Sequence, residues 1–404
     1  AAALEGERVR KEDLQVEFGG KKAHAIEYLR MVGTDEIDDG DIQIIGEDID
    51  GVEVGSAMDL GVEVLVAGRQ MQEDFEGILE RQIHRYVNHA GGVMHMGQRN
   101  LVWLRLSKAA YEAGFRLGHI GTILHAKLHD EYGQLADKVA VRLITDAAEI
   151  EVIRERAAAA YAERDAKLAG MKDEDVDIYY SCTLCQSYAP NHVCVVSPER
   201  LGLCGAYDWL DCKAAFQISP SGCNQPIQKG TTIDAARGEW EGVNKFVYDT
   251  TNRSVERYCQ YSLMDSPMTS CGCFECILAI VPEANGVMVV NREFAGMTPI
   301  GMTFSTLAGS VGGGIQTPGF LGVGRRYLLS EKFISFEGGL ARMVWMPKEL
   351  KDSMGDSLRE CAEAMGMPDL VEKIADETVA EDSAALLEFL QKVEHPALTM
   401  ASLF

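Results

Sequence analysis

Residues 181–204 have the sequence SCTLCQSYAPNHVCVVSPERLGLC and carry four cysteines in one region interrupted by proline. Their spacing is Cys182-x2-Cys185-x8-Cys194-x9-Cys204. Four closely spaced thiolates are typical of an iron–sulfur cluster, because each iron of a [4Fe–4S] cluster takes one cysteine sulfur. We therefore expect a metal-cluster domain built around this segment.

A second thiol motif is the tripeptide Cys271-Gly272-Cys273, within TSCGCFEC. Its two thiolates and the two intervening backbone nitrogens, once deprotonated, can surround one metal in a plane, and glycine lets the backbone curl around that metal. Square-planar N/S ligation is preferred by Ni(II) or Cu(II) and is poor for zinc. The two motifs together predict a cluster beside a planar nickel site.

Other assignments of these thiols stay open on spacing alone. The first motif could hold a structural zinc, although zinc sites usually use two short-spaced pairs and only Cys182/Cys185 is such a pair. Cys273-x2-Cys276 is a competing pair within the second motif. A nickel hydrogenase would need two such pairs around its metal. The alternative function is therefore a non-catalytic zinc or iron–sulfur electron-transfer protein, for which the second motif is dispensable.

Composition and charge narrow the function classes. The chain of 404 residues is 47% apolar and 25% charged, as in soluble globular proteins, and has no apolar run of the ~20 residues that cross a bilayer. Without a secretion signal, we expect a cytoplasmic protein of anaerobes, with eleven cysteines that are reduced or bind metal.

The net charge of -24 disfavours nucleic acid and membranes as partners. Because Ala1-Ala2-Ala3-Leu4 has no initiator Met, we expect the sequence to begin within a longer protein.

The charge is unevenly distributed along the first part of the chain. Residues 1–80 hold 21 acids against 7 bases, whereas residues 81–142 hold 9 bases against 4 acids. This local excess of cations is expected either to bind an anionic ligand or to pair with the acids of the first segment. The nine bases are Arg81, Arg85, Arg99, Arg105, Lys108, Arg116, Lys127, Lys138 and Arg142.

The fold class predicted is α+β, or mixed αβ, with two domains joined by an exposed helix and the metal cluster in the second domain. We expect a mixed αβ domain over residues 1–150, a linker helix over 151–175 and the metal-cluster domain over 176–404. Residues 147–169 have few large apolar side chains, which is typical of an exposed helix.

Individual elements follow from the apolar patterns. Short runs bounded by glycine and aspartate predict strands at 41–45 and 62–66, and an apolar run predicts another at 287–290. Helical spacing of apolar residues predicts one amphipathic helix over 73–88. Two acidic amphipathic helices are expected after residue 350.

Two further motifs do not predict a ligand site. The stretch 312–319 has the sequence GGGIQTPG and lacks the Lys-Ser/Thr ending of a phosphate-binding loop, so we expect a flexible or tightly turned loop. His125 and His129 are four residues apart, but the glutamate of the HExxH zinc motif is absent. We therefore expect both imidazoles at a helix surface or in the core.

Over its whole length the chain resembles CO-methylating acetyl-CoA synthase, the nickel–iron–sulfur subunit of the bacterial carbon monoxide dehydrogenase/acetyl-CoA synthase complex. SCTLCQSYAPNHVCVVSPERLGLCGAYDWLDCKAAF and MTSCGCFECI carry the resemblance in the second half, and GGVMHMGQRNLVWLRLSKAAYEAGFRLGHIG carries it in the first. The resemblance implies an acyltransferase that makes acetyl-CoA from CO, a corrinoid-borne methyl group and coenzyme A. In that family the reaction belongs to carbon fixation by the Wood–Ljungdahl pathway.

The resemblance also implies a ligand set for one [4Fe–4S] cluster and two nickel ions. The cluster ligands would be Cys182, Cys185, Cys194 and Cys204. A proximal nickel would be bridged by the catalytic thiolates Cys185, Cys271 and Cys273, and would keep an open position for substrates. The distal nickel would be held by Cys271, Cys273 and the backbone nitrogens of Gly272 and Cys273.

The resemblance also implies partners for the chain, and the chain differs from the family's usual sequence at one position of the site. The family receives its methyl group from a methylated corrinoid iron–sulfur protein, and CO from carbon monoxide dehydrogenase through an amino-terminal domain that we expect to be absent here. Trp103 and Arg105 lie where its coenzyme A contacts are expected, for stacking on adenine and for binding a phosphate; a core Trp beside a surface Arg is the alternative. The family usually carries Phe where Tyr188 stands, and the Tyr hydroxyl needs a partner in that apolar pocket.

Overall fold

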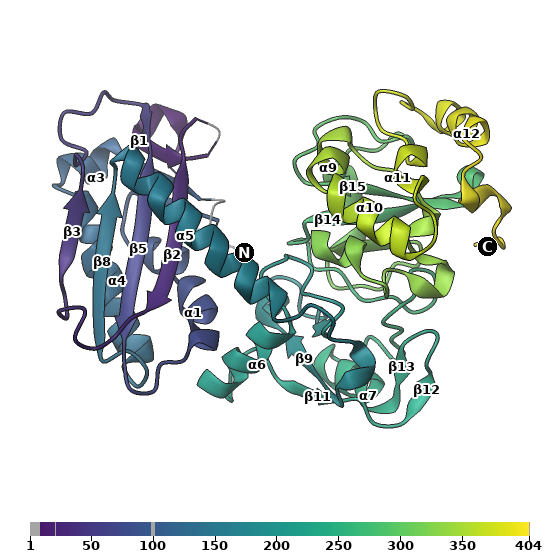
Figure 1. Cartoon of the computed structure of the whole chain (residues 1–404), viewed down its shortest axis with the longest axis horizontal. Helices are drawn as coiled ribbons and strands as arrows, with labels where there is room; N and C mark the ends of the chain where they lie inside the picture. The colour runs from purple at the N-terminus through teal and green to yellow at the C-terminus, as the bar shows by residue number, and fades with distance from the viewer. Residues whose placement is uncertain (1–8, 21, 98–101, 404) are drawn as a thin grey trace. The chain divides into compact units, whose positions relative to one another are not determined.

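A computed structural model describes residues 9–20, 22–97 and 102–403, and the chain divides into two compact units, residues 1–169 and 170–404 (Figure 1). Both units contain helices and sheets, so the mixed αβ class is confirmed.

The main sheet of the first unit has the strand order β2-β5-β8-β3. Its central strand β5 (Leu60–Ala67) pairs in parallel with β2 (Ala25–Met31) and antiparallel with β8 (Lys138–Ile144), and β8 pairs in parallel with β3 (Ile42–Ile45). Every residue of β5 is buried, which explains its nearly continuous run of apolar residues. The strands predicted at 41–45 and 62–66 are confirmed.

A second sheet of the first unit has the order β4-β1-β7-β6. In it, β1 (Leu14–Gly19) pairs in parallel with β4 (Ser56–Met58) and antiparallel with β7 (Trp103–Ser107), which in turn pairs with β6 (Val93–Met96). The register places Glu17 of β1 directly opposite Arg105 of β7. Facing side chains of opposite charge at such positions interact directly.

The helix predicted over 73–88 is divided in two by the structure. It forms α1 (Glu73–Glu80) and α2 (Ile83–Val87), with a break at residues 81–82. The apolar periodicity is nevertheless real, because Phe75, Leu79 and Ile83 are all buried. The next helices along the chain are α3 (Lys108–Glu112) and α4 (Leu117–Tyr132).

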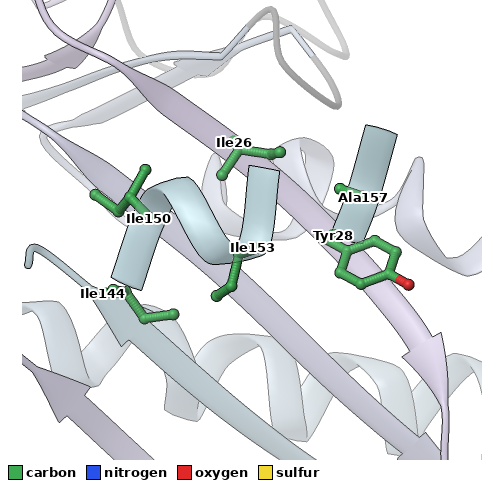
Figure 2. Packing of buried hydrophobic residues seen from close by; sticks show 6 residues of the cluster. All are labelled: Ile26, Tyr28, Ile144, Ile150, Ile153 and Ala157. Carbon is green, nitrogen blue, oxygen red and sulfur yellow. The ribbon is translucent and has the colours of Figure 1, made fainter. Parts of the chain in front are cut away.

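The expectation of an exposed linking helix is not confirmed. Residues 147–166 form α5 (Ala147–Ala166), which lies across β2 and β5 of the first unit. Figure 2 shows Ile150, Ile153 and Ala157 of this helix facing residues of the sheet. Three positions spaced along one face are enough to dock a helix, although its other faces stay polar. The buried cluster consists of Ile26, Tyr28, Ile144, Ile150, Ile153 and Ala157.

The described residues of the second unit form three sheets. β9 (Ile178–Cys182) lies between β10 (Cys194–Val196) and β11 (Pro226–Gln228), and β12 (Thr232–Asp234) pairs with β13 (Glu239–Trp240). The third sheet has the order β16-β14-β15-β17, from β14 (Cys276–Val281), β15 (Gly286–Asn291), β16 (Phe320–Val323) and β17 (Met343–Trp345). The strand predicted at 287–290 is thus confirmed.

Helices of the second unit flank these sheets (Figure 1). Beyond residue 350 the structure has several short helices rather than the two expected. Within the described residues, no helix has the length and apolar character to span a bilayer. The helices are α6 (Trp209–Ile218), α7 (Glu241–Thr250), α8 (Phe304–Val311), α9 (Lys348–Ser353), α10 (Gly355–Ala364), α11 (Leu370–Lys373) and α12 (Ser383–Lys392).

Candidate metal centre

The first thiol motif is built on a pair of antiparallel strands and the turns that follow each strand. Cys182 ends β9 and lies directly opposite Cys194, the first residue of β10. Cys185 lies in a 3-10 turn at Leu184–Ser187, where the Cys185 carbonyl accepts hydrogen bonds from the next turn. Cys204 follows β10 in an irregular segment. Pairing of the two strands therefore brings thiols that are distant in sequence to one end of the sheet.

All four thiols of this motif line a single small cavity. The thiol of Cys271, from the second motif, lines the same cavity. Apolar side chains from Leu184 and Leu203 complete part of the wall. Four converging thiols in a largely apolar enclosure are the donor set that a [4Fe–4S] cluster requires.

Burial keeps the thiols of this cavity protonated while no metal is bound. Burial raises the pKa of Cys194 well above its usual value and that of Cys204 to about 11. The pKa of Cys182 is also raised, by a hydrogen bond with Cys223 and by burial. A metal that binds here would therefore displace protons from the thiols.

The second motif adds two thiols that meet Cys185. Side-chain hydrogen bonds join Cys185 to Cys271, Cys185 to Cys273, and Cys271 to Cys273. The Cys273 N–H also donates to Cys271 Sγ at 3.3 Å. The three thiols that the resemblance assigns to a bridged metal are thus mutual neighbours. Hydrogen bonds from Cys185 and Cys271 lower the pKa of Cys273 well below its usual value.

Gly272 allows this curled geometry. Its φ of +130° lies in a region that residues with a Cβ rarely adopt, although no heavy atom lies within 4 Å of where a Cβ would be. Glycine is therefore required here by backbone conformation and not by lack of space.

Cys276 does not join the other thiols. It is the buried first residue of β14 and is not among the residues lining the thiol cavity. Burial raises its pKa to about 12. The competing pair Cys273/Cys276 is thus not supported by the geometry.

Tyr188 makes a contact that the sequence could not assign. Its hydroxyl donates a hydrogen bond of 2.6 Å to Cys273 Sγ, across 85 positions of sequence. The phenol is 37% exposed, so it lies at the outer side of the thiol group. The partner that a tyrosine needs in this pocket is therefore the thiol itself.

The glycine-rich loop, residues 312–319, contacts both thiol motifs and is tightly turned. Gly313 N–H donates to the Cys271 carbonyl at 3.2 Å, and Gly314 N–H donates to the Ser270 carbonyl at 2.8 Å. A Cβ on Gly314 would lie only 3.0 Å from the His192 nitrogen, so the loop also packs against the segment that leads into Cys194. The run of three glycines was the signal for a tight turn, but nothing in the local pattern identified its partners.

Hydrogen bonds of His192 and Glu275 join residues beside the thiol cavity. The fully buried His192 has Nε2 3.1 Å from Cys194 Sγ and Nδ1 2.9 Å from Thr269 Oγ1. Burial lowers the pKa of His192 to about 4, so the imidazole is neutral at pH 7. The Glu275 N–H donates to the Leu203 carbonyl at 3.1 Å, which ties the second motif to the segment before Cys204.

The predicted coenzyme A residues lie in the first unit, on β7. Glu17 Oε2 accepts hydrogen bonds from both Trp103 Nε1 at 3.0 Å and Arg105 Nε at 2.5 Å. The guanidinium of Arg105 also lies over the Trp103 ring, 4.4 Å from its centroid. Arg105 and Trp103 are thus half-buried partners of one carboxylate.

Several of the other bases in residues 81–142 are paired with acids, which supports the charge-pairing interpretation of this region. Arg116 pairs with Asp50, and Arg142 pairs with Glu63. Arg99 lies outside the described residues.

Two family models and a solved structure match parts of the chain. The model for the carboxy-terminal part of the ACS/CODH beta subunit matches residues 161–404, and the model for the CO dehydrogenase/acetyl-CoA synthase complex beta subunit matches residues 1–150. A solved structure of the carboxy-terminal domain of the acetyl-Coenzyme A synthase Alpha subunit is 54% identical, with a TM-score of 0.32. The match covers 33% of this chain and 100% of that domain.

Curated relatives extend the similarity over almost the whole chain. The "Carbon monoxide dehydrogenase/acetyl-CoA synthase subunit alpha" of Moorella thermoacetica is 52% identical over 98% of this chain, which spans 55% of that relative. The "Acetyl-CoA decarbonylase/synthase complex subunit beta" of Methanopyrus kandleri is 43% identical over 98% of this chain and 83% of its own length. The chain therefore belongs to the CO dehydrogenase/acetyl-CoA synthase complex beta subunit family.

Proposed function

We propose that this chain is an acyltransferase that forms acetyl-CoA from CO, a methyl group carried by a corrinoid protein and coenzyme A. The observation that carries the proposal is the mutual contact of Cys185, Cys271 and Cys273 beside a cavity lined by the other three thiols of the first motif. Family membership supports an enzyme of acetyl-CoA synthesis or cleavage.

The residues fit the metal group that the proposal requires. Cys182, Cys194 and Cys204 would hold a [4Fe–4S] cluster together with Cys185, which would share its sulfur with a proximal nickel. Cys271 and Cys273, with the backbone nitrogens of Gly272 and Cys273, would hold two nickel ions together with Cys185. When bound, this group would supply an electron-rich, open coordination position at which a methyl group and CO can combine.

The chain's own residues would prepare the site for that chemistry. The buried Leu203 of the cavity wall would limit access of water to the thiols on its side. Tyr188 donates a hydrogen bond to Cys273 Sγ and thereby stabilises a thiolate at the bridging position. The glycine-rich loop fixes the Cys271 carbonyl, which sets the direction of the tripeptide.

Metal analysis of anaerobically purified protein, incubated with nickel and desalted, tests this proposal. We expect about four iron and four sulfide, the content of one [4Fe–4S] cluster, and about two nickel in the thiol site. Cys273→Ala should lose the nickel and keep the iron. Cys361→Ala is the matched control, because that thiol donates to the Leu329 carbonyl outside the site.

Two results would overturn the proposal. Zinc without labile sulfide would make the four-thiol segment a structural zinc site, as the alternative function requires. Full retention of nickel in Cys273→Ala would show that the tripeptide does not hold it. A methyl–CO–coenzyme A assay on the loaded chain, with a methylated corrinoid iron–sulfur protein as donor, then tests the acyl transfer itself.

We also propose that Trp103 and Arg105 contact coenzyme A. Because Glu17 Oε2 accepts from both side chains, a phosphate of coenzyme A would compete with this carboxylate for Arg105. Arg105→Ala should weaken coenzyme A binding in calorimetry, whereas Glu17→Gln should strengthen it by weakening the competing pair. Arg116→Ala is the control, since Arg116 also pairs with a carboxylate, Asp50, and lies over the ring of Tyr111. Equal affinities of the Arg105 and Arg116 variants would contradict the assignment.

A further inference from the structure

Two histidines of α4, whose spacing alone predicts no ligand site, lie beside a carboxylate from a distant loop. His125 and His129 occupy successive turns of α4, and Asp39 lies in the loop between β2 and β3. Asp39 Oδ1 is 3.0 Å from His125 Nε2 and 2.8 Å from His129 Nε2. The ring centroids of the two histidines are 4.6 Å apart.

The carboxylate is held firmly in this position by β8. The Val139 N–H donates to Asp39 Oδ1 at 3.0 Å, and the Gly40 N–H donates to the Val139 carbonyl at 2.9 Å. Lys138 Nζ donates to the carbonyls of Thr34 and Ile37, which anchors the same loop. Asp39 is therefore placed by the backbone of the sheet, independently of the histidines.

The surroundings leave access and space at this point. The side chains of His125 and His129 are each 28% exposed and that of Asp39 is 44% exposed. Gly40 has no side chain, and a Cβ there would face the His125 ring at 3.6 Å. Solvent can therefore reach all three side chains, although each of them is partly buried.

We propose that Asp39, His125 and His129 form a binding site for a divalent transition metal ion such as Zn²⁺, separate from the thiol centre. Two imidazoles and one carboxylate are ligands that zinc, nickel and iron accept, whereas magnesium and calcium prefer oxygen alone. Their ligand atoms all lie within 4.8 Å of one another. Three protein ligands leave a fourth position for water.

The two separations from Asp39 Oδ1 to the imidazole nitrogens fit such an ion after a small adjustment. Metal–ligand bonds of about 2.0–2.2 Å place the ligand atoms of a tetrahedral zinc about 3.3–3.5 Å apart. The observed separations from Asp39 Oδ1 to the two nitrogens are slightly shorter, so each imidazole has only to move outward by a few tenths of an ångström. Each Nε2 would give up its proton to the ring's other nitrogen or to solvent, because only an unprotonated nitrogen binds metal.

The surroundings of Asp39 favour the ionised carboxylate, which is the form that binds a metal ion. Partial burial acts to raise its pKa, but hydrogen bonds from the Val139 N–H, His129 and His125 lower the pKa of Asp39 to about 2. A bound ion would join the β2–β3 loop to α4 and so brace one side of the first unit.

Zinc titration of the full chain, with its thiol centre already loaded, tests the site. Wild-type protein should bind one equivalent more Zn²⁺ than His129→Gln or Asp39→Asn. Loss of a direct ligand should weaken this binding by more than the roughly 10–100-fold that loss of a residue supporting a ligand costs. His24→Gln is the matched control, because His24 is an exposed histidine of the same unit.

The Asp39→Asn variant distinguishes loss of a metal ligand from loss of folding. Asp39→Asn keeps an acceptor for the Val139 N–H and the imidazoles, so it should retain the fold, checked by circular dichroism, and lose only the metal. Equal stoichiometry and affinity in wild type, His129→Gln and Asp39→Asn would overturn the proposal and leave Asp39 as a hydrogen-bond acceptor only. The outcome is independent of the thiol centre, since the cysteines are unchanged in every variant.

Discussion

A position can require glycine because of its backbone conformation or because there is no space for a Cβ. Gly272 has only the first requirement, since its φ is unusual and the space around it is open. Gly272→Ala adds a Cβ that meets no heavy atom within 4 Å, but it must hold φ at +130°. Residues in such sparsely populated regions cost of the order of 1–3 kcal/mol. We expect the variant either to lose that much stability in urea unfolding or to relax the tripeptide and lose nickel.

Gly309→Ala is the control for this experiment. Gly309 lies within α8, is exposed, and also has no heavy atom within 4 Å of a Cβ. Alanine there should be stabilising by roughly 0.5–1 kcal/mol, because glycine is costly inside a helix. Equal effects of the two substitutions would remove the conformational argument for Gly272.

Tyr188 supports the thiolate form of Cys273, and the direction of that effect can be measured. Its hydroxyl hydrogen bond lowers the pKa of Cys273, after the larger effects of Cys185 and Cys271. A hydrogen bond to a charged group is worth about 1.5–3 kcal/mol, so Tyr188→Phe should raise the pKa of that thiol by about one to two pH units. The Tyr188 hydrogen bond stabilises the thiolate form of Cys273. Its loss therefore affects the protein only at a pH above the pKa of the Cys273 thiol.

Thiolate absorbance of metal-free protein, followed across pH, checks this expectation. Cys185→Ala should raise the Cys273 pKa further than Tyr188→Phe does, because Cys185 is the first cause of the lowering. Tyr179→Phe is the control, since Tyr179 is a fully buried tyrosine of β9 outside the thiol cavity. A titration curve unchanged in Tyr188→Phe would show that the hydroxyl contact does not matter electrostatically.

At the scale of elements, the glycine-rich loop contacts both thiol motifs. Gly313 and Gly314 both have positive φ, but only Gly314 lies against other backbone, that of Asn191 and His192. Gly314→Ala should therefore displace the segment that leads into Cys194, and lower both iron and nickel retention. Gly313→Ala carries backbone strain without a clash and should affect metal content less.

Metal content of the two variants, measured side by side after reconstitution, decides this point. A larger loss in Gly313→Ala than in Gly314→Ala would mean that strain, and not contact with the His192 segment, controls the site.

The docking of α5 on its sheet gives a second prediction for an element. Ile153 lies in the buried cluster between α5, β2 and β8, whereas the neighbouring Val152 is 48% exposed. Ile153→Ala should cost about 2–5 kcal/mol of the first unit's free energy of unfolding, because it leaves a cavity. Val152→Ala should stay within about 0.5 kcal/mol of wild type. Urea unfolding followed by circular dichroism checks both; equal stability would mean that α5 is not packed as Figure 2 shows.

For the whole molecule, local sequence patterns predict those features that depend on residues close together in the chain. The strands at 41–45, 62–66 and 287–290 follow from short apolar runs, and the thiol motifs are recognisable because their cysteines are closely spaced. The helix over 73–88 was predicted as one, since periodicity continues across the break at residues 81–82.

What the sequence could not predict are partners set by topology. Tyr188 and Cys273 are 85 positions apart, and Asp39 and His125 are 86 positions apart. Such pairs depend on which strands become neighbours, so no local spacing reveals them. His125 and His129 lie on one helix without a glutamate between them, and their acidic partner comes from another loop.

The two proposed metal sites lie in different units, and this gives a prediction for the whole chain. A ligand stabilises only the structure that binds it, by about 2.7 kcal/mol at a hundredfold excess over its Kd. Iron and nickel at the thiols should therefore slow amide hydrogen exchange in β9 and β10 of the second unit. Zinc at Asp39 should slow exchange in β3, β8 and α4 of the first unit, because local openings there expose the ligands. Mass spectrometry of exchanged protein resolves both regions in one experiment, with Cys273→Ala and Asp39→Asn as the reciprocal controls. If zinc protected the first unit equally in Asp39→Asn, the ion would be bound elsewhere. If nickel protected β9 and β10 equally in Cys273→Ala, the tripeptide would not be its ligand.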